Sequence, residues 1–285
     1  MVENANPLDK YYRQPQIYIK LPSEGKWYSP DVFTPTENGE VPVLPMTAKD
    51  ELSFKTPDAM ISGQATVDVI QSCVPSFKNA WKMVNFDTDT VLLAIRIATY
   101  GEFMDVNYNV PVINEPSSTT VNLPALLDSF RNLKITDTAK TKSGFTFKIA
   151  PLDYQLLTKI QVAQFEQQKI YATVSASAVT QEARSKQFAE SFQKLNTINF
   201  ELLIDSITSI TTPENKTVTD KKAITDFINN CEAKIVNEIQ DELGKVRTQA
   251  QIKPLQMKAT EEQIKKGVPA TYEVPVTFDS SNFFG

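Results

Sequence analysis

The sequence predicts an α+β protein: a small mixed N-terminal α/β core with short strands, followed by long amphipathic helices and an extended C-terminal tail. Three observations lead to this prediction. Short runs of alternating apolar and polar residues occur in the first half, apolar residues three or four apart dominate the second half, and prolines and aromatic residues mark the end. With 285 residues and 41% apolar residues, the chain can bury one large core or two modest ones.

The beginning of the chain is expected to form an arm or an edge strand, because it is rich in proline. Within it, residues 17–21 (IYIKL) alternate as a strand does, and the turn-forming sequence PSEGKWY follows them. A short helix is then expected, with Thr56 as its N-cap, Pro57 at its first position and Gly63 just past its end.

A second helix follows directly and ends before Pro75, because proline cannot continue the helical hydrogen bonds. It has an apolar stripe at helical spacing, made of Val67, Ile70 and Val74. Cys73 stands beside this stripe and is expected to be a small core residue rather than a reactive thiol, since reactivity requires electropositive exposure.

The clearest helix lies in FDTDTVLLAIRIATYGEFM, where apolar residues cover most of the circumference and Gly101 marks the end. A helix of this composition is expected to be buried. Asp87 and Asp89 could be paired carboxylates for acid–base chemistry or Mg²⁺, but their place at a helix N-terminus favours capping.

Arg96 is the single basic residue of this apolar helix, and a buried charge needs a partner. Glu102 and Asp105, just beyond the helix end, are the candidates.

Residues 106–121 are rich in β-branched residues, proline and asparagine and predict a small hairpin-like excursion. In residues 144–152 (GFTFKIAPL), the alternation of apolar residues predicts a strand.

The second half of the chain predicts long amphipathic helices over residues 153–170 and 180–207. A polar break follows, and Asp220 is expected to cap a further helix that continues to Gly244. From these signals we divide the chain into an N-terminal strand or arm (1–44), a core of short helices and a small sheet (45–152), a mainly helical region (153–271) and an extended tail (272–285).

The composition excludes several classes of chemistry. The chain has no histidine, which removes imidazole acid–base catalysis and imidazole metal sites, and its eight glycines form no phosphate-binding loop. A net charge of −5 gives no electrostatic basis for nucleic-acid binding. Two distant cysteines, both expected to be reduced, form no metal-binding pair, so no cofactor or metal is expected.

The chain also lacks an apolar run of the roughly 18 residues that a membrane span needs, and its first residues lack the apolar core of a signal peptide. We therefore expect it to stay in the cytosol in which it is made.

Lys49, Asp50 and Glu51 could place a lysine nucleophile beside acids, but an isolated charged triplet favours a solvated turn. These three residues remain candidates for binding a partner.

Several motifs occur in an order that resembles the T4-type bacteriophage baseplate hub protein family. The run VPVLPMTAKDELSFKTPDAMISGQATVDVIQSCVPSFKN, followed by DTDTVLLAIRIATYGEFM, carries the resemblance. The motifs are Pro-Met-Thr at 45–47, Lys-Asp-Glu at 49–51, Pro-Asp-Ala at 57–59, Ser-Cys-Val-Pro at 72–75 and Ala-Thr-Tyr-Gly at 98–101. The sequences IYIKLPSEGKWY and VPVTFDSSNFF are also similar to the ends of the family's chains.

The resemblance implies a late structural or assembly protein of the phage tail baseplate, made in the cytoplasm of the host bacterium and found in the virion. It implies that the protein binds other hub and tail proteins and has no catalytic residues. One departure is clear: relatives carry a Cys-x-x-Cys pair after the Tyr-Gly segment, whereas the corresponding VNYNVPVINEPSSTTVNLP contains no cysteine. A zinc role is therefore not carried over.

Three functions of different classes remain open: a hub subunit or hub-assembly factor, a chaperone absent from the finished particle, and a tail-associated hydrolase that uses carboxylates. The tail leaves two interpretations open as well. Val274, Val276 and Phe278 alternate as a strand does, and Phe283 and Phe284 follow. This segment could add to a partner's sheet with its phenylalanines as anchors, or pair with the chain's own sheet, for example beside residues 17–21.

Overall fold

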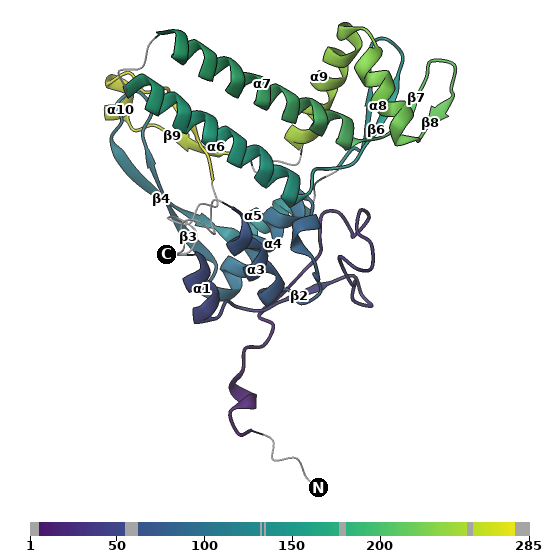
Figure 1. The fold of residues 1–285 in the computed structure, drawn as a ribbon. Helices are drawn as coiled ribbons and strands as arrows, with labels where there is room; N and C mark the ends of the chain where they lie inside the picture. The colour runs from purple at the N-terminus through teal and green to yellow at the C-terminus, as the bar shows by residue number, and fades with distance from the viewer. Residues whose placement is uncertain are drawn as a thin grey trace. The chain divides into compact units, whose positions relative to one another are not determined.

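The computed structural model describes residues 6–54, 62–131, 133, 135–176, 181–249 and 253–276. The chain divides into two compact units. Unit 1 contains Met1–Ala80, Phe86–Asn132 and Ile252–Gly285, and unit 2 contains Trp81–Asn85 and Leu133–Gln251. Helices and small antiparallel sheets alternate along the chain (Figure 1), which confirms the predicted α+β class. The four-segment division predicted from composition stays a prediction.

Unit 1 begins with a short 3-10 helix, η1 (Asp9–Tyr11), and strand β1 (Ile17–Ile19). The predicted strand is therefore confirmed, and its partner is β2 (Val41–Val43), with Ile17 opposite Val43 in an antiparallel register. β1 and β2 turn Ile19, Val41 and Val43 into the core.

Three helices of unit 1 follow: α1 (Ala48–Phe54), α3 (Gln64–Cys73) and α4 (Asn85–Tyr100), with the 3-10 helix η2 (Ala80–Lys82) before α4. The helices predicted around Val67 and Leu93 are confirmed, and Gly101 ends α4 with a φ of 94° that favours glycine. The helix predicted from Thr56 lies outside the described residues. Gly63, its expected end, has a φ of 77° and stands directly before α3.

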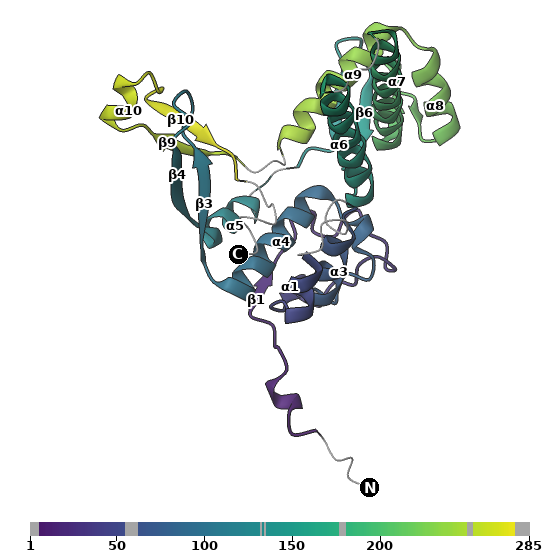
Figure 2. The same ribbon diagram turned by 60° about the vertical axis from the view of Figure 1, so that its left-hand side comes forward.

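The excursion predicted at residues 106–121 is a hairpin of β3 (Phe103–Asn109) and β4 (Pro116–Asn122), and α5 (Leu123–Arg131) follows it directly. A second antiparallel pair joins β9 (Leu255–Lys258) to β10 (Thr271–Val274) around α10 (Glu261–Lys265). The two pairs lie close together (Figure 2), and the hydroxyl oxygens of Tyr108 and Tyr272 are 3.3 Å apart. The first residues of the tail therefore pair with the chain's own strand, as one of the two interpretations expected, but the strand is β9 and not the one at residues 17–21.

Unit 2 contains a four-stranded antiparallel sheet in the order β5-β6-β7-β8. Its strands are β5 (Thr138–Lys140), β6 (Thr146–Ile149), β7 (Ile207–Thr211) and β8 (Thr217–Val218). The predicted strand at 144–152 is confirmed as β6. Phe147 is fully buried in an apolar cluster to which helices α8 (Lys221–Asn230) and α9 (Ala233–Gln249) contribute isoleucine and leucine.

The single helix predicted from Asp220 to Gly244 is two helices. Asp220 does cap α8, since its carboxylate accepts the Ala223 N–H at 2.8 Å. The helical pattern stops at Cys231 and Glu232, however, and α9 continues past Gly244. An apolar stripe persists across this break because both helices contribute to the same cluster, which explains why the pattern predicted one helix.

The two longest helices, α6 (Tyr154–Ala176) and α7 (Gln181–Ser206), confirm the predicted helical region and lie side by side (Figure 1). Glu166 of α6 and Lys194 of α7 form an ion pair of 2.8 Å between them. Phe165 and Phe192, on the same two helices, are 48% and 62% exposed. The outer part of this helix pair therefore presents aromatic side chains to solvent.

Candidate functional site

The charged triplet Lys49, Asp50 and Glu51 belongs to α1 and is not the solvated turn that the sequence predicted. Thr47 starts the helix through a reciprocal pair of hydrogen bonds: the Asp50 N–H donates to the Thr47 hydroxyl, and the Thr47 N–H donates to the Asp50 carboxylate. The sequence Thr-Ala-Lys-Asp at 47–50 has the spacing of a capping box. That spacing is the signal that would have identified the helix.

Asp50 is buried, and its carboxylate holds the N-terminal arm. Its Oδ2 atom accepts hydrogen bonds from Arg13 at 3.2 Å and from the Ser72 hydroxyl at 3.1 Å. The Arg13 guanidinium donates in addition to the Pro45 carbonyl and to the carbonyl and hydroxyl of Ser72. Asp50 therefore has a structural role, because its carboxylate is buried and binds Arg13 and Ser72 of the same chain.

Glu51 points to a different neighbour, at the end of α4. Its carboxylate accepts the Tyr100 hydroxyl at 2.7 Å, and the guanidinium carbon of Arg96 lies 4.6 Å from the centroid of the Tyr100 ring. Burial, with the hydrogen bond to Glu51, raises the pKa of Tyr100 to about 12. Burial also lowers the pKa of Arg96 from its usual value. The Tyr100 side chain thus lies between the other two: its hydroxyl donates to the Glu51 carboxylate, and its ring contacts the Arg96 guanidinium. We call these three side chains the stack.

The partners predicted for Arg96 are not the ones it contacts. The Asp105 carboxylate accepts the Thr120 hydroxyl at 2.6 Å, and the Glu102 carbonyl accepts the N–H that starts α5. Within the part of the chain that the structure describes, Nε and Nη1 of Arg96 are buried and have no hydrogen-bond partner. The Tyr100 ring is the group that faces the cation.

Large apolar side chains are exposed next to this stack. Leu52 directly follows Glu51 and is 66% exposed, Tyr100 is 39% exposed, and Phe103 begins β3 and is 59% exposed. We call Glu51, Leu52, Arg96, Tyr100 and Phe103 the α1–α4 surface. Exposed apolar side chains around an arginine and a tyrosine are typical of sites where proteins bind one another. Lys49, on the same helix, is exposed as well.

Asp87 and Asp89 have roles other than the predicted capping. α4 begins at Asn85, and the Asp87 carboxylate accepts the Ser23 N–H at 3.0 Å and the Tyr28 hydroxyl at 2.6 Å, so it ties the chain before β2 to α4. Burial raises the pKa of Asp87 to about 6 and that of Asp89 to about 7. Asp89 stands one turn into the helix, which is too late for a cap.

Neither cysteine has the setting of a reactive thiol. Both are free, and Cys73 is fully buried, which confirms its predicted place in the core; burial raises its pKa to about 12. Among the described residues, no three Cys, Asp or Glu side chains gather as metal ligands would. Nor does the described part contain a helix that is both long and apolar enough to span a membrane.

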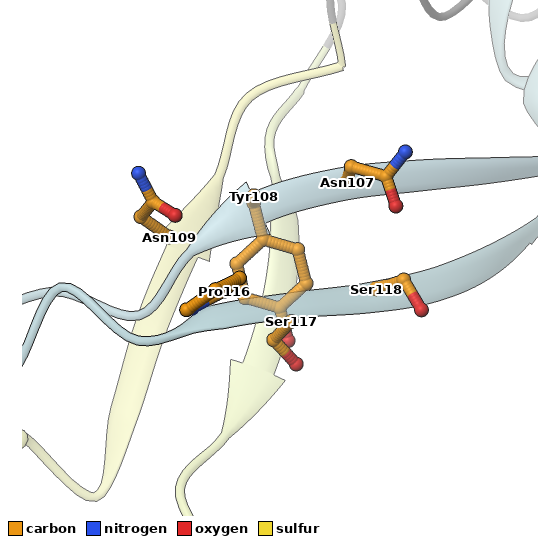
Figure 3. A pocket seen from close by; sticks show the side chains of 6 residues that line it. All are labelled: Asn107, Tyr108, Asn109, Pro116, Ser117 and Ser118. Atoms are coloured by element: carbon orange, nitrogen blue, oxygen red, sulfur yellow. The ribbon is translucent and has the colours of Figure 1, made fainter.

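A shallow pocket of about 480 Å³ lies on the β3–β4 hairpin (Figure 3). Asn107, Tyr108 and Asn109 line it from β3, and Pro116, Ser117 and Ser118 line it from β4. The polar groups are amides and hydroxyls, so the pocket offers hydrogen bonds but no carboxylate or amine for acid–base chemistry. The predicted tail anchors Phe278, Phe283 and Phe284 lie outside the described residues, and their role stays a prediction.

Together these features define a class: an α+β protein with exposed apolar side chains and an arginine that forms no ion pair with any described residue. Comparison with known proteins gives the family. The model of the family described as T4 bacteriophage base plate protein matches residues 14–268. The chain therefore belongs to the T4 baseplate protein family and is a structural protein of a phage tail, as the motif resemblance predicted. No curated protein and no solved structure matches the chain.

Proposed function

We propose that the chain is a hub subunit or hub-assembly protein of the baseplate that acts by binding other hub proteins, without catalysis. The α1–α4 surface is the observation that carries this proposal. A protein that acts alone rarely exposes leucine, tyrosine and phenylalanine so close together, because each exposed apolar side chain forgoes the free energy of burial. The order of hub-like motifs along the chain supports the same conclusion.

The proposal also covers where the protein works. It is made and assembled in the cytoplasm of the host bacterium, as a late protein, and the finished tail baseplate contains it. Nucleic acid is not among its partners, since the net charge of −5 opposes binding to a polyanion. Lys49 and Glu51 are proposed as part of the partner-binding surface, whereas Asp50 acts only through the arm that it holds.

Co-expression of the tagged chain with the other tail genes of the same phage tests the proposal. We expect affinity purification and mass spectrometry to recover at least one hub protein in a stoichiometric complex that survives gel filtration. Recovery of the tagged chain alone would contradict the proposed function. A tag on an unrelated cytoplasmic protein, expressed with the same genes, is the matched control for adventitious capture.

A chaperone that leaves before the tail is complete is the second candidate, and the exposed phenylalanines of α6 and α7 fit transient binding equally well. A denaturing gel of purified virions distinguishes a hub subunit from a chaperone, because a hub subunit is present in the particle and a chaperone is not.

The absence of catalysis is tested directly. Turnover of peptidoglycan or nucleotides by the pure protein, abolished by one carboxylate substitution, would overturn it.

A further inference from the structure

We propose that the α1–α4 surface receives a carboxylate carried on an apolar segment of a partner protein, and that Arg96 is the cation that binds it. This inference rests on the proposed function and adds the chemistry of the partner. It names a binding residue that the charged triplet of the sequence did not suggest. The partner is identified by two properties: an aspartate or glutamate side chain and apolar neighbours on either side of it.

The first argument is the state of the Arg96 side chain. A guanidinium has five N–H donors and no acceptor, and it stays charged at every physiological pH. Nε and Nη1 are buried and unsatisfied among the described residues, and the guanidinium lies against the Tyr100 ring. Burial of two donors without a partner is unfavourable, and since Arg96 as a whole is only half-buried, a partner's anion can approach its guanidinium from the side of Nη2, which is not among the buried nitrogens.

The second argument is that three acidic side chains in this part of unit 1 bind groups other than Arg96. Glu51 accepts the Tyr100 hydroxyl, Asp50 is held by Arg13, and Asp105 accepts the Thr120 hydroxyl. None of the ion pairs among the described residues includes Arg96. Arg131 in the last turn of α5 provides a contrast, since it pairs with Asp128 at 3.1 Å. Within the described ranges of the chain, Arg96 thus carries a charge without a compensating carboxylate.

The third argument concerns the kind of anion. Nucleic acids and other polyanions are bound by several cations together, whereas this part of unit 1 offers Arg96 and Lys49 beside the Glu51 carboxylate, in a chain of net charge −5. Leu52 follows Glu51 and Phe103 comes three residues after Tyr100, and they are 66% and 59% exposed, so the surface combines the Arg96 cation, and the Glu51 carboxylate that binds the Tyr100 hydroxyl, with apolar area. A carboxylate on an apolar protein segment matches the cation and the apolar area.

The Arg96→Gln substitution tests the inference in the co-expression system described above. Glutamine keeps much of the length and the polar character of the side chain but removes the charge. We expect recovery of the hub partner to fall at least tenfold, because arginines of this kind dominate binding energy. We expect the melting temperature to stay equal or to rise, since an uncompensated, partly desolvated cation has been removed.

Two further variants make the result specific. Arg131→Gln is the matched control, because it removes an arginine that already has a carboxylate, and partner recovery should not change. Phe103→Ser removes exposed apolar area without touching the charge, and it should lower recovery while the protein melts normally. Unchanged recovery with Arg96→Gln would overturn the inference and leave the proposed function intact. Absence of any partner with the unmodified chain would instead overturn the proposed function.

A chain truncated after Val276 tests the other possible occupant, the chain's own last residues, which contain Asp279 between Phe278 and Ser280. If these residues supply the carboxylate, truncation and Arg96→Gln should each lower the melting temperature, and the double variant should lower it no further. That outcome would overturn the partner proposal. If truncation leaves the effect of Arg96→Gln on partner recovery unchanged, the carboxylate comes from the partner.

Discussion

Helix α4 of unit 1 and helix α7 of unit 2 differ in how much of their length is buried. α4 has 16 residues, and nine of them are buried in a continuous run from Phe86 to Ile95 that only Asp89 interrupts. α7 has 26 residues, yet its buried side chains, among those described, all lie within its last five residues. Length therefore says little about the contribution of a helix to a core.

The difference comes from how apolar residues are distributed around each helix. In α4 they cover most of the circumference, so that every direction needs an apolar neighbour. In α7 they are spaced three or four apart until the run at 202–204, of which Leu203 and Ile204 enter the cluster around Phe147. Phe192, ten residues earlier, remains exposed. One helix thus organises a core, while the other offers most of its length to solvent or to partners.

The largest expected effect is that of Ile95→Asp in α4. Ile95 is fully buried, and an unpaired carboxylate in a packed core costs several kcal/mol against a total stability of about 5–15 kcal/mol. We expect the variant to be insoluble or to lack a cooperative thermal transition in circular dichroism. Phe192→Asp in α7 is the matched control and should melt like the unmodified protein. A soluble Ile95→Asp protein with a normal transition would show that α4 does not organise the core.

A smaller effect is expected from Asp87→Asn. Burial raises the pKa of Asp87 from 3.8 to about 6 in the folded protein. Protonation of Asp87 therefore stabilises the folded state fully below pH 3.8, and this stabilisation is lost as pH rises through about 6. At 1.36 kcal/mol per unit of pKa difference, the free energy of unfolding changes by about 3 kcal/mol. Asparagine can still accept the Ser23 N–H but carries no charge. The variant should gain stability relative to the unmodified protein between pH 4 and pH 7.

Urea denaturation at pH 4, 5.5 and 7 measures this difference. Asp89 has a raised pKa of the same sign, about 7, so Asp89→Asn serves as a separate comparison and the double variant should have the flattest pH profile. A constant difference between Asp87→Asn and the unmodified protein at all three pH values would mean that Asp87 has the same pKa folded and unfolded.

The smallest effect is expected in unit 2, from Asp220→Ala. The Asp220 carboxylate caps α8 through the Ala223 N–H, and loss of such a cap typically costs about 1 kcal/mol. Asp220→Ser should restore most of the loss, because serine also caps helices. Equal stability of the alanine and serine variants in urea denaturation would show that α8 is held by Ile224 and Ile228 alone.

Local patterns predicted most of the elements. β1, α3, α4, β6 and the cap of α8 were predicted because alternation, helical spacing, proline and a capping aspartate act within a few residues. The break between α8 and α9 was missed, since both helices direct isoleucines to the same cluster. The strand pairs β1–β2 and β9–β10 were missed because register depends on residues far apart in the chain.

The candidate site was harder to predict, because it depends on contacts between distant segments. The sequence singled out Lys49, Asp50 and Glu51 as one triplet. In the structure, however, Asp50 binds Arg13 and Glu51 binds Tyr100, so the three residues do not act together. Arg96 was recognised as a charge in need of a partner, and the nearest acidic residues in sequence were the wrong choice. Asp105 faces Thr120 across the hairpin, a pairing that only the register of β3 and β4 reveals.

Most of unit 2 lies in the sequence between two segments of unit 1, and this sets the order in which parts of unit 1 are synthesised and can pair. Tyr108 must wait for Tyr272, 164 residues later, and Glu115 must wait for Lys266, its 2.7 Å ion-pair partner, 151 residues later. At about 5–20 residues per second the wait is roughly 8–33 s. The sheet of unit 2 is complete before β9 and β10 leave the ribosome. For that interval the β3–β4 hairpin lacks its neighbour, and the nascent chain then exposes surface that the finished protein covers.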